Sequence, residues 1–332
     1  MKVVIDAFGG DYAPYEIVLG TVKALQENEN LKVVLVGDKD RIIEILQQVV
    51  FLSDRLEIVH APDVIANEDE SVDSLRDKKT SSIVVAYDYL ASHDDAVALV
   101  TAGSTGATLA GSQLKLNRID GIKRPALAPM FPTVNDGKVM MLDCGVNAET
   151  TAENMYQFAV MGNEFMKALG VKKPKIALLN LGIAESKGDD QHKLAYQMLK
   201  NSKMNFVGNI ESRDIMRGSV DVVVTDGFSG NICLKSIEGT VEIIFNELKD
   251  ATSKNVKSKL GALLLRSGFA EIKGRYDYRK LGGAPLLGFD KIILKCHGNS
   301  KSDTISNTIL QACKLAENKL VDKVEKAVKN EK

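Results

Sequence analysis

Short runs of β-branched and aliphatic residues recur along the chain, and each is followed by glycine or small polar residues. Most of these runs are separated by stretches in which apolar residues recur every three or four positions, as on one helix face. The runs are Val3–Ile5, Val33–Val36, Ala96–Val100, Val139–Leu142, Ile176–Leu179, Val222–Val224 and Ile292–Leu294. This alternation predicts an α/β fold with a mostly parallel sheet wrapped by helices. Ligands of such folds bind beyond the carboxyl ends of the strands, so the loops there are candidate sites.

The junction after Val222–Val224 is the most informative of these loops. It carries the turn Asp226-Gly227-Phe228-Ser229-Gly230-Asn231, and a helical pattern follows at Leu234, Ile237, Val241, Ile244, Phe245 and Leu248. We expect Ser229 to cap this helix, and Gly227 and Gly230 to let the backbone approach a ligand. The turn is therefore a candidate anion site. A junction that binds nothing is the alternative interpretation.

The pattern contains no linker or repeat that separates independent domains, so we expect a single α/β domain over residues 1–332. The region 240–275 is both basic and apolar, with Gly261 and Gly268 expected to interrupt any single long helix. It is predicted to form a helical protrusion that contacts a membrane, an acidic partner or a second subunit. The lysine-rich end from Lys314 to Lys332 keeps an apolar stripe, which predicts a solvated surface helix.

Composition narrows the possible functions. Lys and Arg number 43 against 44 Asp and Glu, so the net charge of -1 provides no field for holding nucleic acid. The first strand begins at the second residue and no apolar run approaches a membrane span, so we expect a cytoplasmic protein. The four cysteines show no C-x-x-C spacing, which argues against a zinc site or a disulfide framework.

Four further loops follow predicted strands and carry small, polar or charged residues. They are Asp6-Ala7-Phe8-Gly9-Gly10-Asp11, Thr101-Ala102-Gly103-Ser104-Thr105-Gly106-Ala107, Leu142-Asp143-Cys144-Gly145-Val146-Asn147 and the glycine-bounded loop that contains Lys187. Glycines and hydroxyls can donate to phosphate oxygens, and a flexible ammonium can pair with a small anion. For Lys187 an ordinary solvated surface position is the alternative.

His297 follows the last predicted strand. It could donate to an anion or act as a general acid, and a structural hydrogen bond is an equal alternative, whereas His60, His93 and His192 lack such a context. The chain contains neither a Walker A loop nor G-x-G-x-x-G, which argues against ATP and dinucleotide sites. It also lacks a metal-ligand pattern and a nucleophile elbow, which argues against metal hydrolysis and serine-triad chemistry.

Taken together, these loops resemble a bacterial family, the acyl-acyl carrier protein:phosphate acyltransferases of phospholipid synthesis, or PlsX family. The resemblance spans nearly the whole chain. Four of the segments that show the resemblance lie in the loops named above, at Asp6–Asp11, Ala102–Ala107, Leu142–Asn147 and Asp226–Asn231. The other three are Arg124-Pro125-Ala126-Leu127, Glu211-Ser212-Arg213-Asp214-Ile215 and Leu281-Gly282-Gly283-Ala284-Pro285-Leu286-Leu287-Gly288. Departures from the usual pattern are Tyr12, Ser104, Val146, Ser212, Ile183 and Ala184.

The resemblance implies transfer of a long-chain acyl group from acyl carrier protein to inorganic phosphate. It also implies a fold similar to isocitrate and isopropylmalate dehydrogenases and phosphotransacetylases. Its further implications are a homodimer, peripheral contact with the inner membrane surface, and delivery of acyl phosphate to a glycerol-3-phosphate acyltransferase. Because phosphate is itself a nucleophile, the reaction requires no serine or cysteine nucleophile, and no cofactor or metal is expected.

On this hypothesis Lys187 neutralises phosphate or the oxyanion, and Asn231 donates a hydrogen bond at the reacting centre. The expected substrate-binding and phosphate-binding residues are Asp6, Gly9, Gly10, Asp11, Gly103, Ser104, Thr105, Gly106, Asp143, Asn147, Asp226, Gly227, Ser229, Gly230 and His297. The basic residues expected to receive the acidic carrier protein, or else anionic lipid, are Lys254, Lys257, Lys259, Arg266, Lys273 and Arg275.

Three other functions remain open at this stage. A phosphotransacetylase-like enzyme would use a small coenzyme A thioester on the same fold. An NAD-dependent hydroxy-acid dehydrogenase would need a metal-holding acidic cluster, whereas the aspartates here are spread one to a loop. A non-catalytic adaptor would bind carrier protein at the membrane, but it would have no need of anion-binding loops.

Overall fold

The computed structural model describes residues 1–51, 53–66, 71–276 and 281–330. These residues divide into two compact units, each with its own sheet, where the sequence predicted a single domain. The first unit comprises residues 1–129, 160–174 and 281–330, and the second comprises 130–159 and 175–276. Helix α6 (Ala152–Ala168) begins in the second unit and ends in the first, so the boundary falls inside a regular element. A linker search cannot detect such a boundary.

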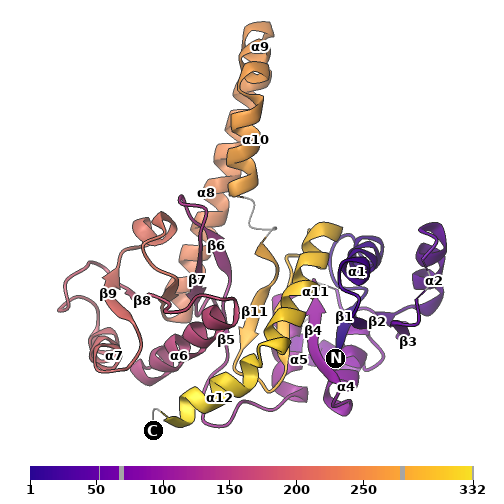
Figure 1. Cartoon of the computed structure of the whole chain (residues 1–332), viewed down its shortest axis with the longest axis horizontal. Helices are drawn as coiled ribbons and strands as arrows, with labels where there is room; N and C mark the ends of the chain where they lie inside the picture. Colours follow the sequence, from indigo (N-terminus) through magenta and orange to yellow (C-terminus); the bar gives the residue numbers. More distant parts are fainter. Residues whose placement is uncertain (52, 67–70, 277–280, 331–332) are drawn as a thin grey trace. The chain divides into compact units, whose positions relative to one another are not determined.

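The first unit is built on a seven-stranded sheet in the order β3-β2-β1-β4-β12-β11-β5 (Figure 1). Its strands are β1 (Lys2–Asp6), β2 (Lys32–Gly37), β3 (Leu56–His60), β4 (Ala96–Thr101), β5 (Ala126–Leu127), β11 (Ala284–Leu287) and β12 (Ile292–Lys295). Strands β1 to β4 and β12 run parallel, and β11 pairs antiparallel with β12 and β5. The central strands carry fully buried aliphatic residues, as a sheet covered on both faces requires.

Helices pack around this sheet. They are α1 (Tyr15–Glu27), α2 (Lys39–Gln48), α3 (Ser71–Asp77), α4 (Ser82–Ser92), α5 (Thr105–Lys115), α11 (Ser302–Glu317) and α12 (Leu320–Asn330). The predicted terminal helix is two helices, because Lys319 adopts a φ of 52° between α11 and α12. Leu320, Val324 and Val328 are buried, so α12 packs through one apolar face, and the last two residues of the predicted helix lie outside the described residues.

The second unit is built on a five-stranded sheet in the order β6-β7-β10-β8-β9. Its strands are β6 (Met130–Pro132), β7 (Lys138–Leu142), β8 (Ile176–Leu179), β9 (Phe206–Ile210) and β10 (Val222–Val224). Strands β7, β10, β8 and β9 are parallel, and β6 is an antiparallel edge strand. The β10 residue Val223 lies opposite Met141 and Ala177, and all three are buried in one core cluster.

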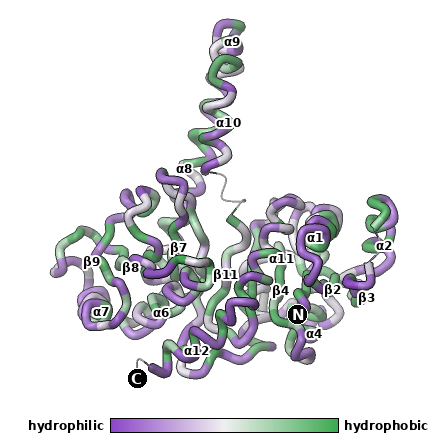
Figure 2. Tube along the Cα trace, viewed as in Figure 1, coloured by the Kyte–Doolittle hydropathy of each residue, from purple (hydrophilic) through white to green (hydrophobic). Residues whose placement is uncertain are grey.

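Helix α7 (Asp190–Lys200), the short 3-10 helix η1 (Ser212–Arg217) and helix α8 (Gly227–Ser253) belong to this unit. With α9 (Val256–Leu264) and α10 (Arg266–Arg275), α8 forms a helical hairpin that extends away from the sheet of its unit (Figure 1). Residues 240–275, for which the sequence predicted a helical protrusion, lie in these three helices and the residues that join them. Apolar and polar residues alternate along it (Figure 2). Among the described residues, no helix is both long and apolar enough to cross a bilayer.

The breaks in the hairpin do not occur at the predicted glycines. Gly261 lies within α9 and Gly268 within α10, while α8 ends before Asn255 and α9 ends before Leu265. The side chain of Asn255 accepts the backbone N–H of Ser258 at 2.9 Å. This N-cap starts a new helix, whereas a glycine costs a helix interior only about 1 kcal/mol and need not end it.

Candidate active site

The loops that follow β7, β10 and β8 lie at one edge of the second sheet. These three strands are neighbours and run parallel, so their carboxyl ends point the same way. The loops after β7 and β10 are tied together by backbone bonds: Thr225 N–H donates to the oxygen of Leu142 at 2.8 Å, and Asp143 N–H donates to the oxygen of Thr225 at 3.1 Å. The structure thus brings together the Asp143, Lys187 and Asp226 loops within one unit.

The N-terminus of α8 is capped by Asp226. Its carboxylate accepts the backbone N–H of Ser229 at 2.8 Å, and its extended backbone precedes the first helical residue. The predicted capping role of Ser229 therefore belongs to Asp226, since an Asp with this backbone can reach the third helical amide. The Ser229 side chain is left exposed at the start of the helix.

Gly227 and Gly230 are buried against the loop that follows β7. A Cβ at Gly227 would collide with the carbonyl oxygen of Asn147, and one at Gly230 would collide with that of Asp143. The close backbone approach expected here is thus made to a neighbouring loop. The two glycines allow α8 to pack directly on residues 143–147.

The loop itself is organised around Asp143, which is fully buried. The Asp143 carboxylate accepts the backbone N–H of Val146 at 3.2 Å, and it accepts the backbone and side-chain N–H groups of Asn147 at 2.7 and 2.9 Å. Asn231 lies against the same loop, because a Cβ at Gly145 would be 3.2 Å from its Cγ. Asp143 and Asn147 hold the loop, whereas Asn231 is exposed on its surface.

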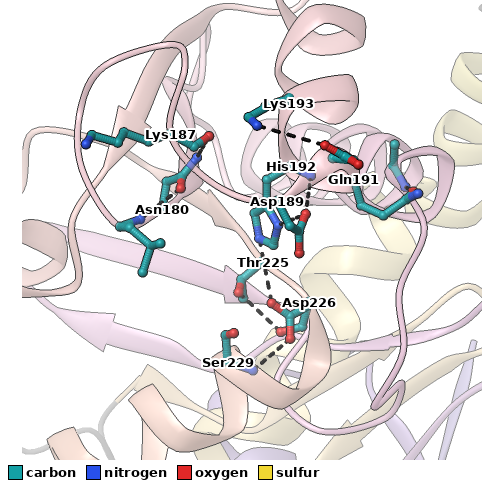
Figure 3. A network of polar contacts seen from close by, with 12 residues as sticks. Asn180, Lys187, Asp189, Gln191, His192, Lys193, Thr225, Asp226 and Ser229 are labelled. Atoms are coloured by element: carbon teal, nitrogen blue, oxygen red, sulfur yellow. Dashed lines mark hydrogen bonds and ion pairs between the residues drawn. The ribbon is translucent and has the colours of Figure 1, made fainter.

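Lys187 lies in the loop between β8 and α7. Asn180 shapes this loop, since its Nδ2 donates to the backbone oxygen of Lys187 at 3.1 Å and its Oδ1 accepts the N–H of Leu181 at 2.8 Å. The Lys187 side chain is exposed, and its ammonium group has no hydrogen-bond or ion-pair partner among the described residues. In Figure 3 this side chain points away from His192 and Asp226. The ammonium is therefore accessible to an anion from solvent.

A polar network that the sequence analysis missed joins the N-termini of α7 and α8 (Figure 3). Asp189 caps α7, and its Oδ1 lies 2.8 Å from both the backbone nitrogen and Nδ1 of His192. The Nε2 of the same imidazole lies 3.7 Å from Oδ2 of Asp226. Hydrogen bonds from the His192 backbone and ring hold the pKa of Asp189 below its usual value. The signal in the sequence that could have revealed it is the Asp-x-x-His spacing of Asp189 and His192 just after the Lys187 loop.

A cavity of about 780 Å³ opens beside this network. One wall is the face of α8 that carries Ile232, Ile237 and Val241, and Leu179 at the end of β8 and Met216 of η1 also line the cavity. Asn180, Asp189, His192 and Ser229 line it as well, so the cavity combines a polar part with a largely apolar one. Its size is typical of a small-molecule site.

The remaining predicted residues lie in the first unit, at the ends of the adjacent strands β1, β4 and β12. They are Asp6, Gly9, Gly10, Asp11, Gly103, Ser104, Thr105, Gly106 and His297. Asp11 N–H donates to the oxygen of Gly298 at 2.8 Å, and Gly10, with a φ of 103°, packs against Ala102. The three loops therefore contact one another, as their strand order predicts.

Within this first cluster, several predicted ligand groups make internal contacts. The Asp6 carboxylate accepts the Thr101 hydroxyl at 2.7 Å and the Phe8 N–H at 3.3 Å, and burial raises the pKa of this carboxyl group. Ser104 caps α5 by accepting the N–H of Ala107 at 3.1 Å. The candidate residues thus form two clusters, one in each unit.

Comparison with known proteins identifies the family. The model of a family described as fatty acid synthesis protein matches residues 1–323. Phosphate acyltransferases of Caldanaerobacter subterraneus subsp. tengcongensis and Thermoanaerobacterium thermosaccharolyticum are 45% and 44% identical over 329 residues, which is 99% of this chain and 97% of each relative.

Among solved structures, a phosphotransacetylase from Streptococcus pyogenes matches with a TM-score of 0.62. It is 17% identical to this chain, and the match covers 96% of this chain and 94% of the other. At this identity the likeness establishes the fold, and it confirms the predicted α/β class. From the full-length sequence match, the chain belongs to the fatty acid synthesis protein, or PlsX, family and is an acyltransferase of the phosphate acyltransferase type.

Proposed function

We propose that this phosphate acyltransferase moves a long-chain acyl group from acyl carrier protein to inorganic phosphate, and that the acyl phosphate serves phospholipid synthesis. The observation that supports it most directly is the arrangement in the second unit. Lys187 is exposed on the loop that follows β8, and Asn231 is exposed on the first turns of α8, which follows the neighbouring strand β10. Their chain neighbours Gly188 and Ile232 line a largely apolar cavity. Phosphate-binding groups beside an apolar cavity suit a reaction between phosphate and a fatty acyl donor.

The proposed reaction begins when a phosphate oxygen attacks the thioester carbonyl carbon. A carbon–oxygen bond forms as the carbon–sulfur bond breaks, and the carrier leaves as a thiolate that takes a proton from water. Lys187 offsets the charge of phosphate or of the carbonyl oxygen, and the Asn231 amide donates to the oxyanion. Since phosphate is already an anion, holding it in position against the carbonyl is the main task of the protein.

We propose further that the enzyme acts as a homodimer in the cytoplasm, with the hairpin of α8 to α10 touching the inner membrane surface. The hairpin exposes Val256, Leu260, Leu263 and Leu264 by 60% or more of their surfaces, beside Lys257 and Lys259. An apolar surface flanked by lysines suits the interface of an anionic bilayer. A glycerol-3-phosphate acyltransferase in that membrane would then receive the product.

The test of the reaction is phosphate-dependent release of free carrier protein from palmitoyl carrier protein, with acetyl-CoA as the competing donor. We expect Lys187→Ala and Asn231→Ala each to lower kcat/KM by about 10²–10³-fold, because each removes one group that stabilises developing charge. Lys193→Ala is the matched control, since Lys193 is an exposed lysine of α7 whose nearest acid is Asp190 at 3.9 Å.

Three outcomes would contradict this proposal. Wild-type turnover with normal phosphate dependence in both alanine variants would remove Lys187 and Asn231 from the site. A preference for acetyl-CoA over palmitoyl carrier protein would instead support the phosphotransacetylase-like alternative. Carrier-protein binding without thioester loss would support the adaptor.

A further inference from the structure

The cavity beside α8 is elongated along one helix face. Its lining residues on α8 include Ile232, Cys233, Ile237 and Val241, and they recur at spacings that keep them on one side of the helix. The lined segment runs from Ser229 to Val241, so it extends for about 18 Å at roughly 1.5 Å of rise per residue. Leu179 at the end of β8 and Met216 of η1 line it as well.

The two ends of this cavity differ in polarity. At the N-terminal end of α8 it is lined by Ser229, together with Asp189 and His192, whereas Ile237 and Val241 lie towards the other end. The same helix face continues beyond the cavity with Ile244 and Leu248, which are 52% and 39% exposed. An occupant would therefore place a polar group near the start of α8 and an apolar tail along the helix.

The charges of the residues that line the cavity indicate which class of ligand it can bind. Apart from His192, Arg213 is the one basic residue among the described residues that line the cavity, and its Nη2 is held by Glu211 at 2.8 Å. A nucleotide tail with several phosphates would require more free cations than this. An uncharged hydrocarbon chain requires none, and it gains free energy from contact with apolar walls.

We propose that this cavity binds the hydrocarbon chain of the acyl donor, with the carbonyl near the start of α8 and the chain running past Thr240 and Val241. Thr240 and Val241 then determine how long a chain is accepted. This inference rests on the proposed function, because it locates the acyl part of the same substrate.

The test uses a substitution that narrows the far end of the cavity. Thr240 is exposed and lines it, so Thr240→Trp adds bulk without disturbing the core. We expect kcat/KM for palmitoyl carrier protein to fall about tenfold or more relative to octanoyl carrier protein. Glu242→Trp is the matched control, because Glu242 is an exposed residue of α8 that lies about 160° around the helix from Thr240 by its spacing.

A binding measurement separates this inference from the proposed reaction. Hexadecylphosphonate, an uncleaved mimic of an acyl phosphate with a chain as long as palmitoyl, is titrated into wild type and both variants by calorimetry. We expect about tenfold weaker binding in Thr240→Trp alone. If wild type binds the probe about tenfold more tightly than Thr240→Trp does but transfers no acyl groups, the proposed reaction is wrong and the cavity assignment stands. An unchanged palmitoyl-to-octanoyl ratio together with unchanged probe affinity in Thr240→Trp would overturn the cavity assignment.

Discussion

Asp189 accepts two hydrogen bonds from one residue, the backbone N–H and the ring Nδ1 of His192, at 2.8 Å each. This pair fixes the start of α7, and through Nε2 of His192 it faces the cap of α8 at Asp226. The network therefore ties together two helix N-termini that border the cavity.

We expect Asp189→Ala to lower the free energy of unfolding by about 1 kcal/mol, the usual effect of losing an N-cap. The pKa of Asp189 is lowered in the folded state, so its stabilisation is present above the usual aspartate pKa of about 4 and is lost as the pH falls through the folded pKa. The difference between wild type and variant should thus shrink from pH 7 to about pH 3, measured by urea denaturation. Asp190→Ala, which removes the adjacent exposed carboxylate, is the control.

Equal destabilisation by Asp189→Ala and Asp190→Ala would show that negative charge at the start of α7 stabilises the protein and that the cap hydrogen bonds of Asp189 add nothing to this. A difference that stays constant down to about pH 3 would contradict the role of the ionised carboxylate.

At the scale of elements, Gly230 and Gly239 of α8 lie in opposite surroundings. Gly230 is buried, and a Cβ there would collide with the backbone oxygen of Asp143. Gly239 has nothing within 4 Å of a Cβ position. Gly230→Ala should therefore destabilise the protein by about 1–3 kcal/mol. Gly239→Ala should stabilise it by up to about 1 kcal/mol through helix propensity.

Thermal and urea denaturation of the two glycine variants provide the measurement, with each serving as the control for the other. We also expect Gly230→Ala to lower acyl transfer, because it displaces α8 from the loop beneath Asn231. If Gly230→Ala is as stable as wild type, the close packing of α8 on the Asp143 loop is wrong.

The elements differed in how well the sequence predicted them. Buried parallel strands such as β10 are contiguous apolar runs, and all seven predicted strands are confirmed. The edge strands β3 and β9 were missed, because their residues are mostly half-buried or exposed and lack an apolar run. The hairpin breaks were misplaced at Gly261 and Gly268, since the cap at Asn255 has a stronger effect than glycine on where a helix starts.

At the scale of the whole molecule, the hairpin of α8 to α10 is the part that we propose contacts the membrane. Of the basic residues predicted to receive the carrier protein or lipid, Arg275 pairs with Asp136 at 2.6 Å and with Glu271 at 3.1 Å. Arg275 thus anchors α10 to the turn before β7. Lys254, Lys257 and Lys259 are exposed near the far end of the hairpin, beside its apolar residues.

We expect Leu263→Glu to abolish flotation with anionic liposomes, because it places a charge on an apolar surface that would enter the bilayer. Lys257→Glu should weaken flotation in a salt-dependent way, by about 1 kcal/mol for the lost lysine and more for the added acid. Val50→Glu is the control, since Val50 is 91% exposed in the first unit. Carrier-protein titration in solution should be unchanged by Leu263→Glu.

A raised KM for the carrier protein in Leu263→Glu and Lys257→Glu, with flotation unaffected, would assign the hairpin to the carrier protein. A change in oligomeric state of both variants would assign it to the second subunit.

The sequence by itself determined the α/β class, the main strands, the loops at their ends and the family. All of these depend on residues that are contiguous in the chain, where periodicity and loop composition can be recognised. Only the tertiary structure decided that the candidate residues form two clusters, that Gly227 and Gly230 pack on the Asp143 loop, and that His192 joins Asp189 to Asp226. It also created the cavity along α8. These features depend on side chains that meet only after the strands have taken their order in the sheet. The local pattern of apolar and polar residues does not determine that order.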